Sequence, residues 1–306
     1  MTTIAIAGFG KIAKDQHLPA LRNSQDFELT AIASRNATLE GVDNHQDIES
    51  LLAAVPALDA VALCTPPQVR YAQAVAAIEA GKHVLLEKPP GVSLSEVEDL
   101  VRRAGQQGVT LYATWHAREA AGVEKAREWL STRRVTGVNI QWREDMRQWH
   151  PGQQWVWEPG GLGVFDPGIN ALSITTHILP EAFFLREAIL EVPENCQSPI
   201  GATLEFTDFH GTPIHADFDW RQTGPQTWQI TVETEDGTLV LDSGGSQLSI
   251  NGKCVVDGED VEYAGLYRRF AELIRSGRSD VDVAPFRHVA DAFLLGRRQS
   301  VEAFIE

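Results

Sequence analysis

The chain has 306 residues, of which 43% are hydrophobic and 22% charged, and its formal net charge is −16. These values are typical of a globular protein with one large domain or two of average size. Lysine and arginine form no dense cluster, and the acidic balance therefore argues against a nucleic-acid-binding protein.

Three further features concern location and partners. No run of about 18 apolar residues is present, and the start "MTTIAIAGFG" lacks the basic segment and cleavage site of a signal peptide. The three cysteines are scattered without metal-ligand spacing, which suggests a reducing compartment. We therefore expect a cytoplasmic protein with no membrane span, no nucleic-acid partner and no metal site.

The first third of the chain alternates predicted strands with predicted helices. Helical patterns cover "QVRYAQAVAAIEAGK" (68–82) and "LSEVEDLVRRAGQQG" (94–108). Strands separated by helices of this length predict a parallel, doubly wound sheet with right-handed connections. The segments with the apolar character of buried strands are 3–8, 27–34, 59–65, 83–88 and 110–115.

The pattern changes after residue 118. A helical segment (122–134) leads into "VTGVNIQWRED" and a loop rich in tryptophan and glycine. Alternation with period two over 202–222 and 227–253, with "HG", "DG" and "NG" turns, predicts an antiparallel meander. Segments 263–277 and 285–304 return to helix. We therefore predict an α/β protein with a first domain at 1–118 and, at 119–306, an α+β domain with a large, mainly antiparallel open sheet.

The first predicted strand ends in a glycine-rich turn. "GFGKIA" places Gly8, Gly10 and Ala13 in a G-x-G-x-x-A pattern before a helix. The first glycine permits the tight turn, the second lets the backbone approach a pyrophosphate, and the third position must be small for helix–strand packing. The pattern predicts a Rossmann domain that binds NAD(P), and a structural turn without a ligand is the alternative.

The end of the second predicted strand bears on the choice of cofactor. An NAD site normally has a carboxylate there, which accepts a hydrogen bond from the ribose 2′-hydroxyl. This chain has Ser34, Arg35 and Asn36 instead. Because an arginine and a hydroxyl suit a 2′-phosphate, we expect a preference for NADP, with NAD also possible.

Three segments resemble the glucose–fructose oxidoreductase/inositol dehydrogenase/rhizopine-catabolism (Gfo/Idh/MocA) family. They are the glycine motif, "LLEKPPG" (85–91) one strand after "LCTPP" (63–67), and "GGLGVFD" (160–166), and the resemblance spans essentially the whole chain. Within the family, "ATWHAR", "WHPGQQWVWEPGGLGVFDPGINALS" and "FDWR" are similar to the bacterial L-arabinose/D-galactose 1-dehydrogenase branch.

The resemblance implies roles for three residues. Lys88 matches the E-K-P lysine near nicotinamide and substrate, and Asp166 matches the aspartate of the family's D-x-G-x-H motif. Asn170 replaces the histidine of that motif. A carboxamide cannot take up a proton near neutral pH, and Asn170 can therefore orient a sugar hydroxyl but cannot act as the general base. We expect Asp166, Lys88 and Asn170 to be catalytic, with Asp166 favoured over Lys88 as the base.

The remaining expected contacts divide between the two ligands. The residues expected at the dinucleotide are Gly8, Gly10, Lys11, Ile12, Ser34, Arg35, Thr65, Pro66, Glu87 and Lys88. The residues expected at the sugar are Lys88, His116, Glu144, Trp149, His150, Asp166 and Asn170. Four tryptophans (142, 149, 155 and 157) precede Asp166, and aromatic plates beside carboxylates suit a neutral sugar. The alternative role for any single tryptophan is packing in the core. The alternative role for His116 or for Asp166 is capping a helix.

The resemblance, together with the dinucleotide motif and the tryptophan-rich segment, implies an NAD(P)-dependent aldose 1-dehydrogenase that oxidises the anomeric C1 of a neutral aldose, such as L-arabinose or D-galactose, to the lactone. Two alternatives stay open: a polyol or inositol-type dehydrogenase of the same family, and a non-catalytic nucleotide-sensing regulator. The exposed face of the antiparallel sheet is the expected surface for a homo-oligomer.

Overall fold

The computed structural model describes residues 1–259 and 261–306, which form two compact units. The first unit comprises Met1–His116 and Tyr263–Asp282, and the second comprises Ala117–Glu262 and Val283–Glu306. The division into domains at residue 118 stays a prediction. By its contacts, the segment Tyr263–Asp282 packs with the N-terminal unit, although the sequence patterns grouped it with the second domain.

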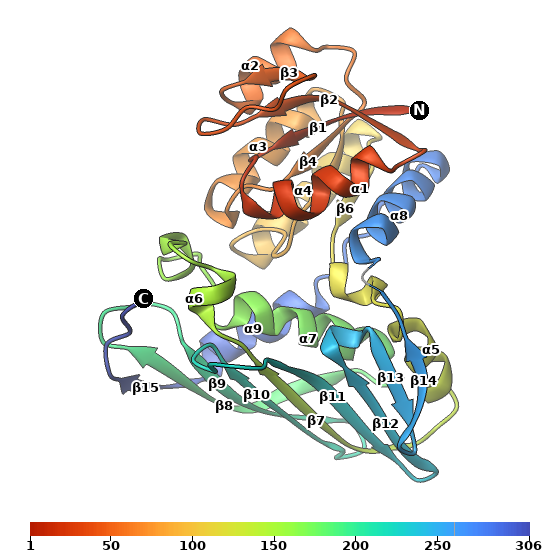
Figure 1. Ribbon diagram of the computed structural model, residues 1–306, viewed down its shortest axis with the longest axis vertical. Helices are drawn as coiled ribbons and strands as arrows, with labels where there is room; N and C mark the ends of the chain where they lie inside the picture. The colour runs from red at the N-terminus through yellow and green to blue at the C-terminus, as the bar shows by residue number, and fades with distance from the viewer. Residues whose placement is uncertain (260) are drawn as a thin grey trace. The chain divides into compact units, whose positions relative to one another are not determined.

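The N-terminal unit is built on a six-stranded sheet of order β3-β2-β1-β4-β5-β6 (Figure 1). All neighbouring strands in it are parallel, which confirms the predicted doubly wound sheet. The strands are β1 (Thr2–Ala7), β2 (Phe27–Ala33), β3 (Asp43–His45), β4 (Ala60–Leu63), β5 (His83–Leu86) and β6 (Leu111–Ala113).

Helices cover both faces of this sheet, because successive side chains of each strand point to opposite sides. Ala5 and Ala7 face the core under α2 (Ile48–Ala54), α3 (Pro67–Glu79) and α4 (Leu94–Gln107). Ile4 and Ile6 face the other core, which includes Phe270. That core is covered by η1 (Ala13–His17), α1 (Leu18–Arg22) and α8 (Glu262–Ser276). A distant part of the chain therefore completes this unit.

The second unit contains a nine-stranded sheet of order β14-β13-β12-β11-β7-β10-β9-β8-β15. Pairs β7–β10 and β8–β15 are parallel and the other neighbours antiparallel, which confirms the mainly antiparallel sheet. The strands are β7 (Val135–Arg143), β8 (Phe183–Pro193), β9 (Gly201–Asp208), β10 (Pro213–Asp219), β11 (Thr227–Thr234), β12 (Gly237–Asp242), β13 (Gln247–Ile250), β14 (Lys253–Asp257) and β15 (Arg297–Val301).

The helix predicted over 285–304 is wrong in its second half. Helix α9 (Ala284–Leu295) ends at Gly296, and β15 then pairs in parallel with β8, joining Arg297 to Ile189. Gly296 passes close to α9 and β8, since a Cβ there would lie 2.4 Å from the Ala292 carbonyl oxygen. The residues after α9 therefore pair with the open edge of β8 and form a strand of the sheet.

One face of the large sheet carries α5 (Val123–Leu130), α7 (Phe165–Ile178) and α9 (Figure 1). On β7 the buried Ile140 and Trp142 alternate with Asn139 and Gln141, which are more exposed. The short helices η2 (His116–Glu119), α6 (Met146–Trp149), η3 (Gln154–Val156) and η4 (Ser243–Gly245) lie in the connections. No helix in the described part of the chain is long and apolar enough to cross a membrane.

Candidate active site

The glycine-rich turn after β1 has the backbone that its motif predicts. Gly8 has φ +89°, and a Cβ there would lie 2.7 Å from the Thr65 backbone nitrogen, so only glycine fits. A Cβ on Gly10, in contrast, would have nothing within 4 Å. The main chain at Gly10 is therefore open to close approach, and this geometry fits a dinucleotide pyrophosphate.

Four of the side chains expected at the dinucleotide lie in the turn after β1 and just after β2. Lys11 pairs with Asp15 at 2.5 Å, and Ile12 is 37% exposed. Arg35 is exposed just after β2, and Ser34 is half-buried. Arg35 makes no ion pair with another described residue, which leaves its guanidinium free to meet an anion.

Glu87, the acidic residue of the E-K-P motif, is held in a buried polar network. Its Oε1 lies 3.0 Å from His17 Nε2 and accepts a hydrogen bond from the Tyr263 hydroxyl at 3.0 Å. His17 Nδ1 lies 2.7 Å from the Tyr267 hydroxyl. The other carboxylate oxygen accepts from the backbone N–H of Lys88 at 2.9 Å. Glu87 is therefore tied to η1, to α8 and to the residue proposed for catalysis.

The charges of the His17–Glu87 pair stabilise each other. Burial by itself raises the pKa of Glu87, but the hydrogen bond and charge of His17, with the charges of His116 and Lys88, lower it to about 2. Burial opposes a charge on His17, yet its interactions with Cys64, Tyr267 and Glu87 raise the pKa of His17 well above 6.5. At neutral pH the pair is therefore a buried imidazolium and carboxylate.

Arg70 on α3 links the two loops at the carboxyl edge of the sheet. It is 3% exposed and donates to the backbone oxygens of Thr65, Glu87 and Pro89. It thereby fixes the "LCTPP" and "EKPP" loops against each other. Sequence reasoning missed Arg70, His17 and Tyr263, because none lies in a motif and only the fold brings them to the loop.

In the second unit, Asp166 lies in the first turn of α7 and is 2% exposed. The helix N-cap is Val164 and makes no side-chain capping bond, so Asp166 is not the cap residue. Asn170 follows one turn later and is half-buried, on the same side of the helix.

Two glycines of "GGLG" set the start of α7. A Cβ on Gly161 would lie 2.2 Å from the Trp155 carbonyl oxygen, and one on Gly163 would lie 2.2 Å from the Pro199 carbonyl oxygen. The main chain before Asp166 therefore packs directly on two neighbouring segments. This close packing explains why glycine precedes the carboxylate.

His150 lies between Asp166 and Glu144. Its Nδ1 is 3.6 Å from Asp166 Oδ2, and its Nε2 is 3.7 Å from Glu144 Oε1. Glu144 is 4% exposed and accepts hydrogen bonds from the indole N–H groups of Trp220 and Trp228, each at 3.0 Å. The structure thus brings together three of the residues predicted at the sugar.

The four predicted tryptophans separate into two groups. Trp142 and Trp157 are 4% and 8% exposed and belong to the core, as the packing alternative held. Trp149 is 37% exposed, donates its indole N–H to Gln226 and lies 5.5 Å from the Trp228 ring. Trp155 is half-buried. Sequence reasoning missed Trp220 and Trp228 as partners of Glu144; the "FDWR" segment was the signal for Trp220.

His116 and Lys88 belong to the N-terminal unit. The His116 ring, at the start of η2, stacks on Tyr263 with 5.4 Å between ring centroids. His116 is therefore packed on the same tyrosine that donates to Glu87.

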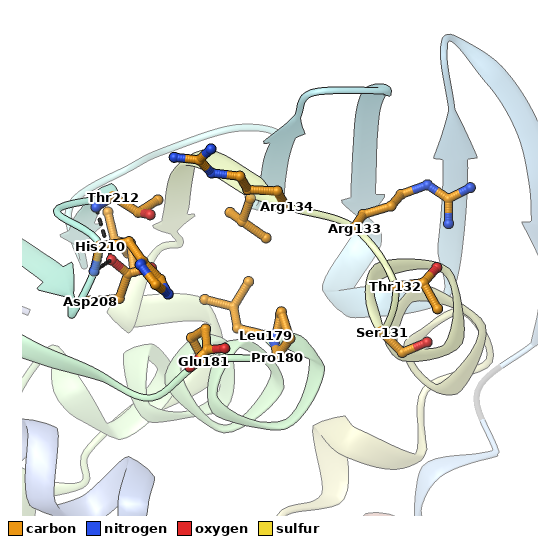
Figure 2. Close-up of a pocket in the computed structure, with 12 residues that line it drawn as sticks. Ser131, Thr132, Arg133, Arg134, Leu179, Pro180, Glu181, Asp208, His210 and Thr212 are labelled. Atoms are coloured by element: carbon orange, nitrogen blue, oxygen red, sulfur yellow. Dashed lines mark hydrogen bonds between the residues drawn. The ribbon is translucent and has the colours of Figure 1, made fainter.

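A separate pocket of about 670 Å³ lies at the other end of α7 (Figure 2). It is lined by Leu179 and Pro180 after that helix and by the β9–β10 turn, where Asp208 accepts from the backbone of His210 and Thr212. No residue predicted at the cofactor or the sugar lines it. Asp166 and this pocket are separated by the helix length, roughly 20 Å. Among the described residues, no group of three or more histidine, cysteine or acidic side chains could hold a metal ion.

Comparison with known proteins gives a consistent family assignment. Residues 2–114 match the model of the Gfo/Idh/MocA oxidoreductase family, described as having an NAD-binding Rossmann fold. The chain is 46% identical over 303 residues to galactose 1-dehydrogenase from Pseudomonas fluorescens, covering 99% of this chain and 98% of that one. The chain belongs to this oxidoreductase family.

Two solved structures resemble the chain over almost its full length. A D-galactose-1-dehydrogenase protein from Rhizobium etli is 55% identical, with a TM-score of 0.95 and coverage of 99% of this chain and 97% of that one. A 3-ketoreductase from Actinomadura kijaniata, solved with NADP and TDP-benzene, has a TM-score of 0.84 at 18% identity, covering 98% and 99%. The second likeness is one of fold.

Proposed function

We propose that this chain oxidises the anomeric C1 of a neutral aldose to the lactone, using NADP in preference to NAD. The full-length similarity to galactose 1-dehydrogenase carries this proposal. The cluster of the buried Glu144 and Asp166 with the half-buried His150 supports it, because carboxylates, an imidazole and nearby indoles suit a ring with several hydroxyls. D-galactose and L-arabinose are the first candidates.

The reaction requires removal of a hydride from C1 and of the proton from its hydroxyl. The nicotinamide, when bound, accepts the hydride. In the proposal the Asp166 carboxylate takes the proton, because a hemiacetal hydroxyl is a better acid than an ordinary alcohol. Lys88 positions the C1 oxygen, because a fixed positive charge stabilises the negative charge that develops on that oxygen.

The other residues orient the sugar. Asn170, one helical turn after Asp166, donates to or accepts from a hydroxyl. Glu144 and His150 hold further hydroxyls, with Trp149 as an apolar plate beside them. Each oxygen of Glu144 already accepts one indole N–H, so the carboxylate is held in place before the sugar binds.

The proposed cofactor preference depends on Arg35. Its exposed guanidinium after β2 suits a ribose 2′-phosphate, and no carboxylate occupies the neighbouring positions. Gly10 supplies the open backbone for the pyrophosphate. Glu87, Thr65 and Pro66 line the same edge of the sheet.

The testing experiment is an absorbance screen for NADPH and NADH formation across aldoses and polyols. Oxidation at C1 of an aldose yields a lactone, whose hydrolysis releases acid, whereas a polyol dehydrogenase yields a neutral ketone. Turnover with D-galactose or L-arabinose and acid release supports the proposal. Turnover only with inositols would establish the first alternative, and cofactor binding without any turnover would establish the regulator.

We also propose a cytoplasmic homo-oligomer formed through the face of the large sheet that α5, α7 and α9 leave uncovered. On β7 and β10 that face presents Asn139, Gln141, His215 and Asp217. Light scattering on the purified protein tests the oligomer, and a monomer at micromolar concentration would rule it out.

A further inference from the structure

Residues 302–306 follow β15 and return toward α6 (Figure 1), the short helix that ends at Trp149 and leads into the loop beginning at His150. Three contacts join them to that loop. The Arg147 guanidinium lies 4.5 Å from the Phe304 ring centroid and donates to the Ile305 carbonyl oxygen at 2.9 Å. Glu306 Oε1 accepts the backbone N–H of Gly152 at 2.6 Å. The loop is thus held on both sides of His150.

The 302–306 segment is itself anchored at Asn195. The Asn195 side chain accepts from the Phe304 N–H at 2.9 Å and donates to the Phe304 carbonyl oxygen at 2.7 Å. Beside the segment lies a cavity of about 550 Å³, lined also by Arg147, Ile200 and Arg221. No packed side chains fill the side of the 302–306 segment that faces this cavity. The position of the segment therefore depends on its contacts with Asn195, Arg147 and Gly152.

A chain of aromatic contacts leads from Phe304 to Glu144 and His150. Phe304 lies 5.7 Å from Trp157, and Trp157 lies 5.4 Å from Trp220. Trp220 donates to Glu144 and its ring is 5.1 Å from His150. A shift of Phe304 is therefore transmitted through the packed indoles of Trp157 and Trp220 to the two side chains that are proposed to hold the sugar.

We propose that Phe304 is a positioning residue for the sugar site, acting through Arg147 on the His150 loop and through Trp157 and Trp220 on Glu144. Phe304 does not touch the sugar. It sets the geometry of the groups that do, and the proposal rests on the function proposed above. Binding of the sugar depends on the 302–306 segment, whereas binding of the cofactor does not.

The test compares Phe304→Ala with Phe304→Tyr, which keeps the ring. For Phe304→Ala we expect the KM for the sugar to rise roughly tenfold while kcat changes far less, because ground-state and transition-state contacts weaken together. Phe304→Tyr should restore most of the affinity. The Kd for NADP, measured by fluorescence without sugar, should not change. Phe209 is an 81% exposed aromatic residue at the β9–β10 turn. Phe209→Ala is therefore the matched control and should behave as wild type.

The outcomes separate this inference from simple packing. If Phe304→Ala lowers only the melting temperature and leaves the sugar KM unchanged, Phe304 is a structural residue and the inference is wrong. If that variant does not fold, Arg147→Lys keeps the charge but loses the planar stacking on Phe304, and it should raise the sugar KM in the same way. An unchanged KM there also overturns the inference. If wild type oxidises a polyol instead of an aldose, the proposed function fails, and the same KM comparison with that substrate still tests Phe304.

Discussion

His17 Nε2 lies 3.0 Å from Glu87 Oε1, with the two side chains 0% and 4% exposed. This buried pair links η1, the helix after the glycine-rich turn, to the segment that carries Lys88. Both partners also bond to a tyrosine of α8, His17 to Tyr267 and Glu87 to Tyr263.

Loss of His17 should destabilise the protein in a pH-dependent way. The pKa of His17 is raised, so its contribution is fully present below pH 6.5 and is lost as the pH rises through the higher folded-state value. The pKa of Glu87 is lowered from 4.5 to about 2, so its contribution is present above pH 4.5 and lost toward pH 2. His17→Gln should therefore cost most between pH 4.5 and 6.5, on the order of 3–5 kcal/mol.

Denaturant unfolding of wild type and His17→Gln across pH 3–10 checks this, with His177→Gln as the control. His177 pairs with Glu124 at 3.1 Å near the surface, so the same substitution there should cost no more than about 1 kcal/mol. A His17→Gln deficit that does not change with pH would show that the pair is not charged in the folded protein.

Arg35→Ala should change the choice of cofactor. It removes a charge-assisted contact that only a 2′-phosphate would make, so binding of NADP should weaken by about 1.5–3 kcal/mol, with little change for NAD. Fluorescence titration with both cofactors measures the two Kd values. Equal losses would contradict the 2′-phosphate role.

Lys88→Ala should reduce turnover by roughly 100-fold or more while the fold survives, because a positioned cation at the C1 oxygen is lost. The backbone N–H of residue 88 keeps its hydrogen bond to the Glu87 carboxylate, so the backbone conformation of the loop should not change. Steady-state rates and circular dichroism check the two parts. Near-normal turnover in the folded variant would exclude the proposed role.

Asp166→Asn keeps the shape of the side chain and removes its basicity. We expect turnover to fall by about 10²–10⁴-fold, the range for general-base catalysis, while sugar and cofactor still bind. Asn170→Ala should raise the sugar KM and slow turnover less. Single-turnover hydride transfer separates these effects, and if Asp166→Asn retains most of its rate, Lys88 becomes the leading candidate for the base.

Local sequence was sufficient for much of the N-terminal unit. Buried parallel strands are short continuous apolar runs, and the turn at Gly8 needs a positive φ, so both leave a pattern within a few residues. The i, i+4 spacing of Asp166 and Asn170 also predicted their common helix face. Local patterns missed β3 and β15, because short strands such as "RRQSV" depend on a neighbour rather than on their own apolar periodicity.

The surroundings of the candidate site were decided by tertiary structure. Glu87 meets His17 and Tyr263, which lie 70 and 176 positions away, and Glu144 meets Trp228, 84 positions away. A side-chain hydrogen bond between distant residues has no periodicity in sequence, since the fold alone sets which surfaces meet. The sequence by itself therefore determined the dinucleotide motif, the Asp166–Asn170 spacing and the family. Only the tertiary structure decided what holds Lys88, Glu144 and His150 in place, because those contacts depend on packing between distant segments.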